Sequence, residues 1–124
     1  METINELTYK IIGCAYKVHT NLGPGLLEST YEHCLAQEFL VKGLKFERQA
    51  GLPVVYLNSR LDAGYRIDLL VEDQVILELK SVDQIIAIHK AQLLTYMKLS
   101  GKKIGLLINF IVVSLKEGIV RMIL

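Results

Sequence analysis

Asp68, Glu78 and Lys80 have the side-chain types and the spacing to act on a charged substrate. They lie on two apolar segments separated by residues 72–74, an acidic stretch typical of a hairpin turn. Such a turn places Asp68 across the sheet from Glu78, and the period of two puts Glu78 and Lys80 on one face. Two carboxylates and an ammonium at one point can hold a divalent cation and activate a water beside it. Taken alone, the spacing also fits a solvated hairpin with a cross-strand ion pair.

A second group of residues, Gly25, Glu28 and Tyr31, has the spacing G-x-x-E-x-x-Y at the start of a predicted helix. Glu28 lies beside the apolar stripe of that helix, where a carboxylate is costly to bury unless it is paired, hydrogen-bonded or bound to a metal. The alternative is a capping role, because the macrodipole and reach-back capping both favour Glu in a first helical turn. Both interpretations of Glu28 stay open at this point.

A third group lies on the helix predicted after the Glu-x-Lys strand. His89, Gln92 and Tyr96 recur at intervals of three and four, so they share one face. A polar ridge in this place could lay hydrogen-bond donors over a phosphate, and the alternative is a solvated face. We favour Gln92 for a role, because its amide can bind a phosphate oxygen or position a water.

Other chemically capable residues give weaker signals. We interpret His19 as a packing histidine with its hydrogen bonds satisfied, and we expect Cys14 and Cys34 to be free thiols on helices. Arg48 and Gln49 end a predicted strand and could approach the site, although no local pattern requires it. The sequence contains no P-loop, Rossmann glycine pattern or zinc-ligand spacing.

Hydrophobic periodicity predicts the elements that must position these residues. Helices are expected over residues 6–20, 26–42 and 85–99, with a sharp break at 21–25. Strands are expected over residues 45–49, 53–57, 60–71, 75–81, 104–110 and 118–124, with a turn at 58–59. This order predicts a sandwich of the α+β or α/β class around a mixed sheet.

Composition bounds the class of protein. The 124 residues suffice for a single domain, here 1–124, and a hydrophobic share of 52% fits a compact core. The net charge of +1 is not that of a typical nucleic-acid binder, so any such contact would need a local patch. The longest apolar run, 104–115, is interrupted by Asn109 and Ser114 and is too short to span a membrane. The N-terminus is acidic where a signal peptide is basic, so we expect a cytoplasmic protein.

With these groups in place, the chain resembles the GxxExxY family, small proteins assigned to the PD-(D/E)XK nuclease superfamily. The resemblance covers nearly the whole chain, in segments 18–19, 22–31, 48–49, 65–69, 78–81, 92–96 and 106–110. It implies a restriction-endonuclease-like α/β sandwich of αβββαβ topology with a central mixed sheet. Ile67 stands where the superfamily pattern has its proline.

The resemblance also implies roles. Asp68 and Glu78 match the metal-binding carboxylates, which with the backbone carbonyl of Leu79 would hold Mg²⁺ or Mn²⁺, and Lys80 matches the catalytic lysine. Glu28 matches a further metal ligand. Gln92 and Tyr96 resemble a Q-x-x-x-Y element that takes part in catalysis in one branch of the superfamily.

Two functions follow as expectations. The first is a metal-dependent phosphodiesterase, a nuclease acting on DNA or RNA, which the complete set of Asp68, Glu78 and Lys80 favours. The second is a catalytically silent nucleic-acid-binding or protein-interaction module of the same fold, which the small size and near-neutral charge favour. A homodimer or an accessory protein would enlarge the binding surface in either case.

Overall fold

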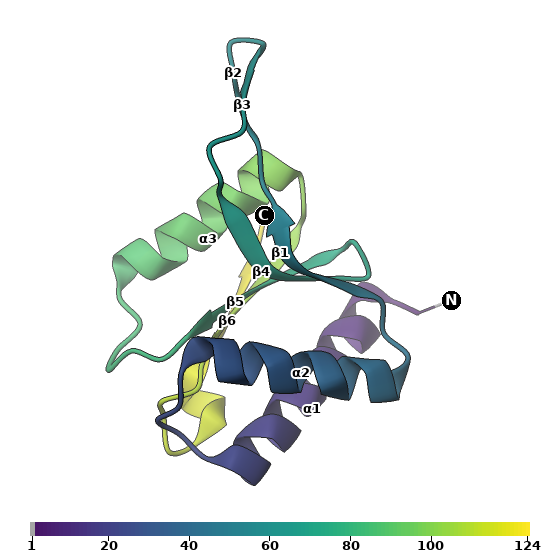
Figure 1. Cartoon of the computed structure of the whole chain (residues 1–124), viewed down its shortest axis with the longest axis vertical. Helices are drawn as coiled ribbons and strands as arrows, with labels where there is room; N and C mark the ends of the chain where they lie inside the picture. The colour runs from purple at the N-terminus through teal and green to yellow at the C-terminus, as the bar shows by residue number, and fades with distance from the viewer. Residues whose placement is uncertain (1) are drawn as a thin grey trace.

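The computed structural model describes residues 2–124, whose elements are labelled in Figure 1. In chain order they are α1 (Ile4–Leu22), α2 (Glu28–Lys42), β1 (Phe46–Gly51), β2 (Val54–Tyr56), β3 (Ser59–Leu61), β4 (Arg66–Val71), β5 (Val75–Lys80), α3 (Ala87–Ser100), β6 (Ile104–Asn109), the 3-10 helix η1 (Leu115–Gly118) and β7 (Ile119–Ile123). The three helices lie close to their predicted bounds, and the predicted break between the first two is confirmed.

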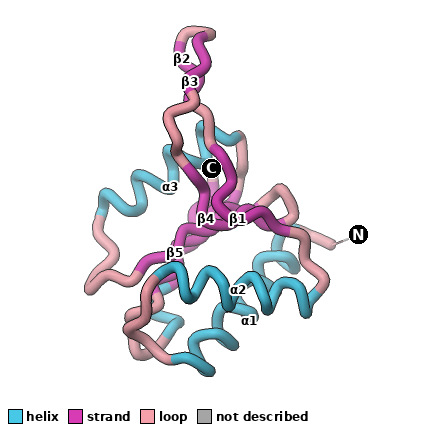
Figure 2. The backbone as a smooth tube through the Cα atoms, in the orientation of Figure 1, coloured by secondary structure: helices cyan, strands magenta, loops and turns pink. Residues whose placement is uncertain are grey.

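A mixed sheet with the strand order β1-β4-β5-β6-β7 forms the centre of the fold. β5 and β6 are parallel and joined by the crossover helix α3, whereas the other neighbours are antiparallel. Figures 1 and 2 show α1 and α2 on one side of the sheet and α3 on the other. One buried apolar cluster fills the layer under α1 and α2, and a second, with Leu93 and Met97, fills the layer under α3. The predicted α/β sandwich with a central mixed sheet is confirmed.

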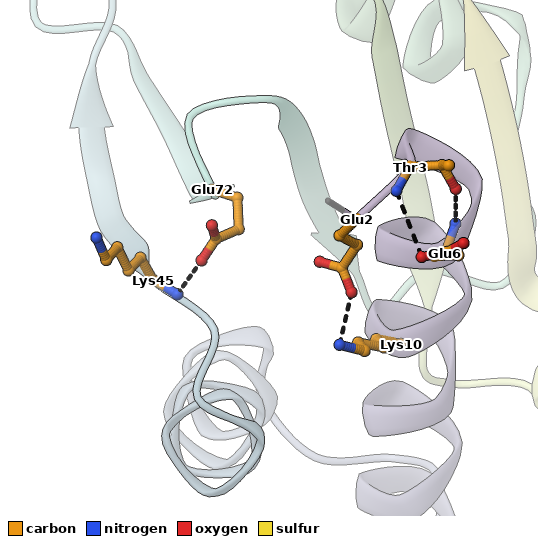
Figure 3. A network of polar contacts seen from close by, with 6 residues as sticks. All are labelled: Glu2, Thr3, Glu6, Lys10, Lys45 and Glu72. Atoms are coloured by element: carbon orange, nitrogen blue, oxygen red, sulfur yellow. Dashed lines mark hydrogen bonds and ion pairs between the residues drawn. The ribbon is translucent and has the colours of Figure 1, made fainter.

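Local sequence explains how α1 begins. Glu6 donates its backbone N–H to Thr3 Oγ1 at 3.1 Å, and the Glu6 carboxylate accepts from the Thr3 N–H at 3.4 Å, forming a capping box (Figure 3). The helix then buries an apolar stripe that includes Ile11 and Val18 against the sheet. His19 is buried near the end of α1 and contacts the Val112 carbonyl oxygen through Nε2 at 2.7 Å, as expected of a packing histidine.

The β4–β5 hairpin forms as predicted. Its turn holds Glu72 and Asp73 in left-handed backbone conformations, with φ of 52° and 54°. Glu72 also joins the turn to the start of β1, because its carboxylate accepts from the Lys45 N–H (Figure 3). Its own backbone N–H donates to the Lys45 carbonyl. The turn is therefore tied to a neighbouring strand, which stabilises the strand register on which the site depends.

The predicted long strand over residues 60–71 is wrong. The chain forms β3, leaves strand geometry over residues 62–65, and starts β4 at Arg66, with Gly64 in the break at φ +83°. The turn before β3 also lies one residue earlier than predicted, since Leu57 and Asn58 adopt the left-handed conformations. β2 and β3 thus form a separate hairpin that projects from the body of the molecule (Figure 1).

Cys14 on α1 is buried and Cys34 on α2 is half-buried, and both are free thiols, as predicted. Burial raises the pKa of the Cys14 thiol. Among the helices of residues 2–124, none is both long enough and apolar enough to cross a membrane.

Candidate active site

Asp68 and Glu78 lie where β4 and β5 stop pairing through their backbones. The ladder runs from Val71 opposite Val75 to Leu69 opposite Leu77, so Asp68 follows at the level of Glu78. Here side chains replace the ladder. Glu78 Oε2 accepts from the Asp68 N–H at 2.9 Å, and Asp68 Oδ2 accepts from the Leu79 N–H at 2.8 Å. This reciprocal clamp fixes both carboxylates and leaves Asp68 Oδ1 and Glu78 Oε1 for other partners.

The clamp holds the carboxyl groups of Asp68 and Glu78 in a partly buried environment. Glu78 is 5% exposed, and its burial, followed by the charge of Asp68, raises the pKa of its carboxyl from 4.5 to about 8. Burial likewise raises the pKa of Asp68, against the hydrogen bond from Leu79. A cation between the two carboxylates would offset both effects, because it stabilises their charged forms.

A cavity of about 590 Å³ opens onto this clamp. It brings together the predicted Asp68, Glu78 and Lys80 of the hairpin, the predicted Leu79 between them, and the predicted Glu28 of α2. Its lining comprises Leu27, Glu28, Ser29, Glu32, Gln49, Asp68, Glu78, Leu79 and Lys80. The sequence pattern therefore predicted side chains that share one cavity in the folded chain.

The G-x-x-E-x-x-Y group has a structural basis at the start of α2. The Tyr31 hydroxyl donates to the Gly23 carbonyl at 2.6 Å and accepts from the Leu26 N–H at 3.1 Å. Gly25 has φ +97°, which favours glycine. The turn and its tyrosine anchor thus place the exposed Glu28 at the cavity rim, in the first helical turn where the macrodipole also favours it.

The α3 residues lie further from the clamp. Tyr96 is half-buried against the apolar cluster under α3, and the pKa of its hydroxyl is raised by burial and then by the negative charge of Glu78. Gln92 is exposed one turn earlier and does not line the cavity. His89 caps α3, since its Nδ1 accepts from the Ile86 N–H at 3.0 Å.

Sequence reasoning missed Glu32, which is 7% exposed and also lines the cavity. Its carboxylate accepts from Arg48 Nε at 3.1 Å, from Arg48 Nη2 at 3.0 Å and from Gln49 Nε2 at 2.6 Å. The signal was present: Glu32 lies one turn after Glu28 and next to the buried Tyr31, and a carboxylate in such a place needs partners. Arg48 and Gln49, whose approach to the site the sequence left open, supply them.

The family model for the PD-(D/E)XK nuclease superfamily matches residues 5–122. The chain belongs to this superfamily. Comparison with curated proteins found no match, and comparison with solved structures found none either. The mixed sheet flanked by helices agrees with the restriction-endonuclease-like fold of the PD-(D/E)XK superfamily.

PD-(D/E)XK nucleases generally depend on a divalent metal. Residues 2–124 contain no group of three or more His, Cys, Asp or Glu side chains arranged to hold an ion. The clamp leaves Glu78 Oε1 free of the clamp hydrogen bonds and Asp68 Oδ1 with one contact, at 3.5 Å from Gln49 Nε2, beside a cavity that Glu28 also lines. Carboxylate and carbonyl oxygens suit Mg²⁺ or Mn²⁺ better than zinc, which prefers nitrogen and sulfur ligands. The Asp68 and Glu78 carboxylates therefore fit such an ion once a backbone carbonyl, a water or a substrate oxygen completes the set of ligands.

Proposed function

We propose that this chain is a metal-dependent phosphodiesterase, a nuclease that cleaves DNA or RNA. The observation that supports it best is the Asp68–Glu78 clamp, which faces one cavity together with Lys80. A purely structural hairpin has no need to bury two carboxylates against each other, because such burial costs free energy without a compensating partner.

In this proposal Asp68, Glu78 and the carbonyl of Leu79 hold Mg²⁺ or Mn²⁺, with Glu28 as a further ligand, directly or through water. When bound, the ion supplies Lewis acidity and lowers the pKa of a coordinated water. Glu28 is exposed at the rim of the cavity, so it can turn toward an ion or remain in solvent.

The remaining side chains act on the phosphodiester itself. Hydrolysis forms a bond from water oxygen to phosphorus and breaks a P–O ester bond, so negative charge grows on the phosphate oxygens. Lys80, half-buried and two residues from Glu78 on the same strand face, orients the water or stabilises that charge with its ammonium. Gln92 contacts the phosphate or the attacking water from α3, and Tyr96 supports it from the following turn.

We further propose that the chain belongs to the GxxExxY family within the superfamily. The support is the turn in which Gly25 adopts φ +97°, Tyr31 anchors the preceding loop and Glu28 reaches the cavity. Each residue of the motif then has a separate physical task.

The alternative is a catalytically silent module that binds nucleic acid or a protein. One observation favours it: the net charge of +1 is not that of a typical nucleic-acid-cleaving protein, which must attract a polyanion. Cleavage assays decide between the two functions.

The test is a panel of single-stranded, duplex, branched and RNA substrates with Mg²⁺ or Mn²⁺, run beside Lys80→Ala. Cleavage by the wild type that requires the metal and falls with Lys80→Ala supports the nuclease. Cleavage that is unchanged in Lys80→Ala contradicts the mechanism, and no cleavage of any substrate favours the silent module.

A further inference from the structure

Along both β1 and β4, the alternating pattern of side chains shifts from one face of the sheet to the other at the level of the clamp. Leu69 packs in the cluster under α1 and α2, whereas Ile67, two residues earlier, packs in the cluster under α3. On β1, Phe46 and Ala50 divide between the same two clusters. Ordinary alternation would keep residues two or four apart on one face, so each strand is locally distorted.

Gln49 lies at this distortion. Arg48 pairs with Leu69 and Ala50 pairs with Ile67, so Gln49 is opposite Asp68. Its φ is 51°, a left-handed conformation that is uncommon for a non-glycine residue and costs free energy. Glycine would adopt this conformation without steric cost. A glutamine here has a strained backbone, which points to a use for its side chain.

The Gln49 side chain connects α2 to the clamp. Its Nε2 donates to Glu32 Oε1 at 2.6 Å and lies 3.5 Å from Asp68 Oδ1, the oxygen that Leu79 does not engage. Glu32 itself is buried, and the Arg48 guanidinium holds it through two nitrogens. The amide nitrogen of Gln49 is therefore held in place between two carboxylates, one structural and one belonging to the candidate metal centre.

We propose that Gln49 is a positioning residue that orients Asp68 for the metal ion, and that Arg48 and Glu32 hold Gln49 in place. The inference rests on the proposed function, since it gives Asp68 a metal to bind. The fixed amide limits rotation of the Asp68 carboxylate, so Oδ1 keeps one direction toward the cavity. Glu32 in this arrangement is a support for Gln49 and not a metal ligand, because three donors already engage its two oxygens.

The first experiment is calorimetric titration of Mn²⁺ into the wild type and Gln49→Gly, with thermal unfolding of each metal-free protein. Glycine relieves the backbone strain but leaves Glu32 Oε1 without its Gln49 donor, so the unfolding midpoint should fall modestly. Mn²⁺ affinity should fall about 10- to 100-fold, as for the loss of other residues that orient a metal ligand. A structural role alone would lower the midpoint and leave the affinity in place.

Leu57→Gly is the matched control. Leu57 has φ 49° and is 83% exposed in the turn between β2 and β3, so the substitution relieves a similar strain away from the clamp. Leu57→Gly should bind Mn²⁺ with the affinity of the wild type.

A second variant, Glu32→Gln, removes the charge that holds Arg48 and Gln49, and should also weaken Mn²⁺ binding. Combined with Gln49→Gly, it should add little further loss, because both act through one contact.

The outcomes separate the two hypotheses. If the wild type binds Mn²⁺ and Gln49→Gly binds it equally well, the positioning role is overturned and the proposed metal site stands. If the losses of Mn²⁺ affinity in Gln49→Gly and Glu32→Gln add fully in the double variant, the inference that Glu32 acts through Gln49 is overturned. A wild type that binds no Mn²⁺ overturns the proposed metal site and this inference with it.

Discussion

The ring of Tyr31 on α2 stacks on the ring of Phe110, which follows β6, with centroids 4.3 Å apart and planes inclined by 6°. The same tyrosine anchors the Gly23–Leu26 turn through its hydroxyl. One side chain therefore joins the end of the central sheet to the turn that presents Glu28. Tyr31 therefore links the sheet to the candidate active site through the turn that precedes Glu28.

Tyr31→Phe should preserve the stack and remove both hydroxyl hydrogen bonds. We expect a loss of about 1–3 kcal/mol in the free energy of unfolding, because the Gly23 carbonyl and the Leu26 N–H lose a partner. Denaturant unfolding measures it. Tyr9→Phe, at an 81% exposed tyrosine on α1, is the control and should change little. Equal stability of the wild type and Tyr31→Phe would contradict an anchoring role for the hydroxyl.

Asp68→Asn should abolish Mg²⁺ or Mn²⁺ binding and cleavage while the chain stays folded. Asparagine keeps an oxygen that can accept from the Leu79 N–H, so the clamp persists without the charge. Asp68→Ala should remove binding as well, with an added loss of stability. Calorimetric titration of each protein measures binding, and Asp62→Asn, at an exposed partner of Arg60, is the control. Metal binding by Asp68→Asn as tight as that of the wild type would remove Asp68 from the site.

Lys80→Ala should bind the metal as tightly as the wild type does and cleave the substrate more slowly. The ammonium acts on charge that develops in the transition state, so we expect kcat to fall by about 10²–10³ with little change in metal affinity. Single-turnover cleavage beside metal titration separates the two quantities. Lys102 pairs through its ammonium with Asp73 at the other end of the hairpin. The control variant Lys102→Ala should therefore keep the cleavage rate and the metal affinity of the wild type. A parallel loss of metal binding in Lys80→Ala would assign the lysine a structural role instead.

The metal-free protein should lose stability as pH rises from about 4.5 to about 8. The pKa of Glu78 is about 8 in the folded chain, against an ordinary value of 4.5. Between these values the folded state binds more protons than the unfolded state, so the free energy of unfolding falls as pH rises. The raised pKa of Asp68 acts in the same direction at lower pH.

Thermal unfolding in chelator across this pH range measures the effect. Glu78→Gln should flatten the profile, since the amide does not titrate there and can still accept from the Asp68 N–H. Added Mn²⁺ should oppose the decline by binding the ionised carboxylates. A wild-type profile that rises over the same range would show that Glu78 is ionised in the folded protein.

The sequence by itself determined the features that depend on local pattern. A turn at 72–74 between two apolar strands set the level of Asp68 against that of Glu78, and the period of two set Lys80 on the face of Glu78. The helices followed from their apolar periodicity and glycine stops. These signals lie within a few residues of each other, so they can be interpreted before the fold is known.

Only the tertiary structure decided how distant segments meet. Glu32 and Gln49 are 17 residues apart, and no local pattern announces their contact or the left-handed backbone of Gln49. The break that divides β3 from β4 also escaped the sequence, because alternation over residues 60–71 looked continuous while Gly64 permitted a bend. Burial supplies the physical reason: a side chain's partners, and so its charge state and orientation, depend on which element packs over it. The sequence could therefore single out Asp68 as a candidate metal ligand, but only the packing of α2 against β1 placed Gln49 and Glu32 beside it.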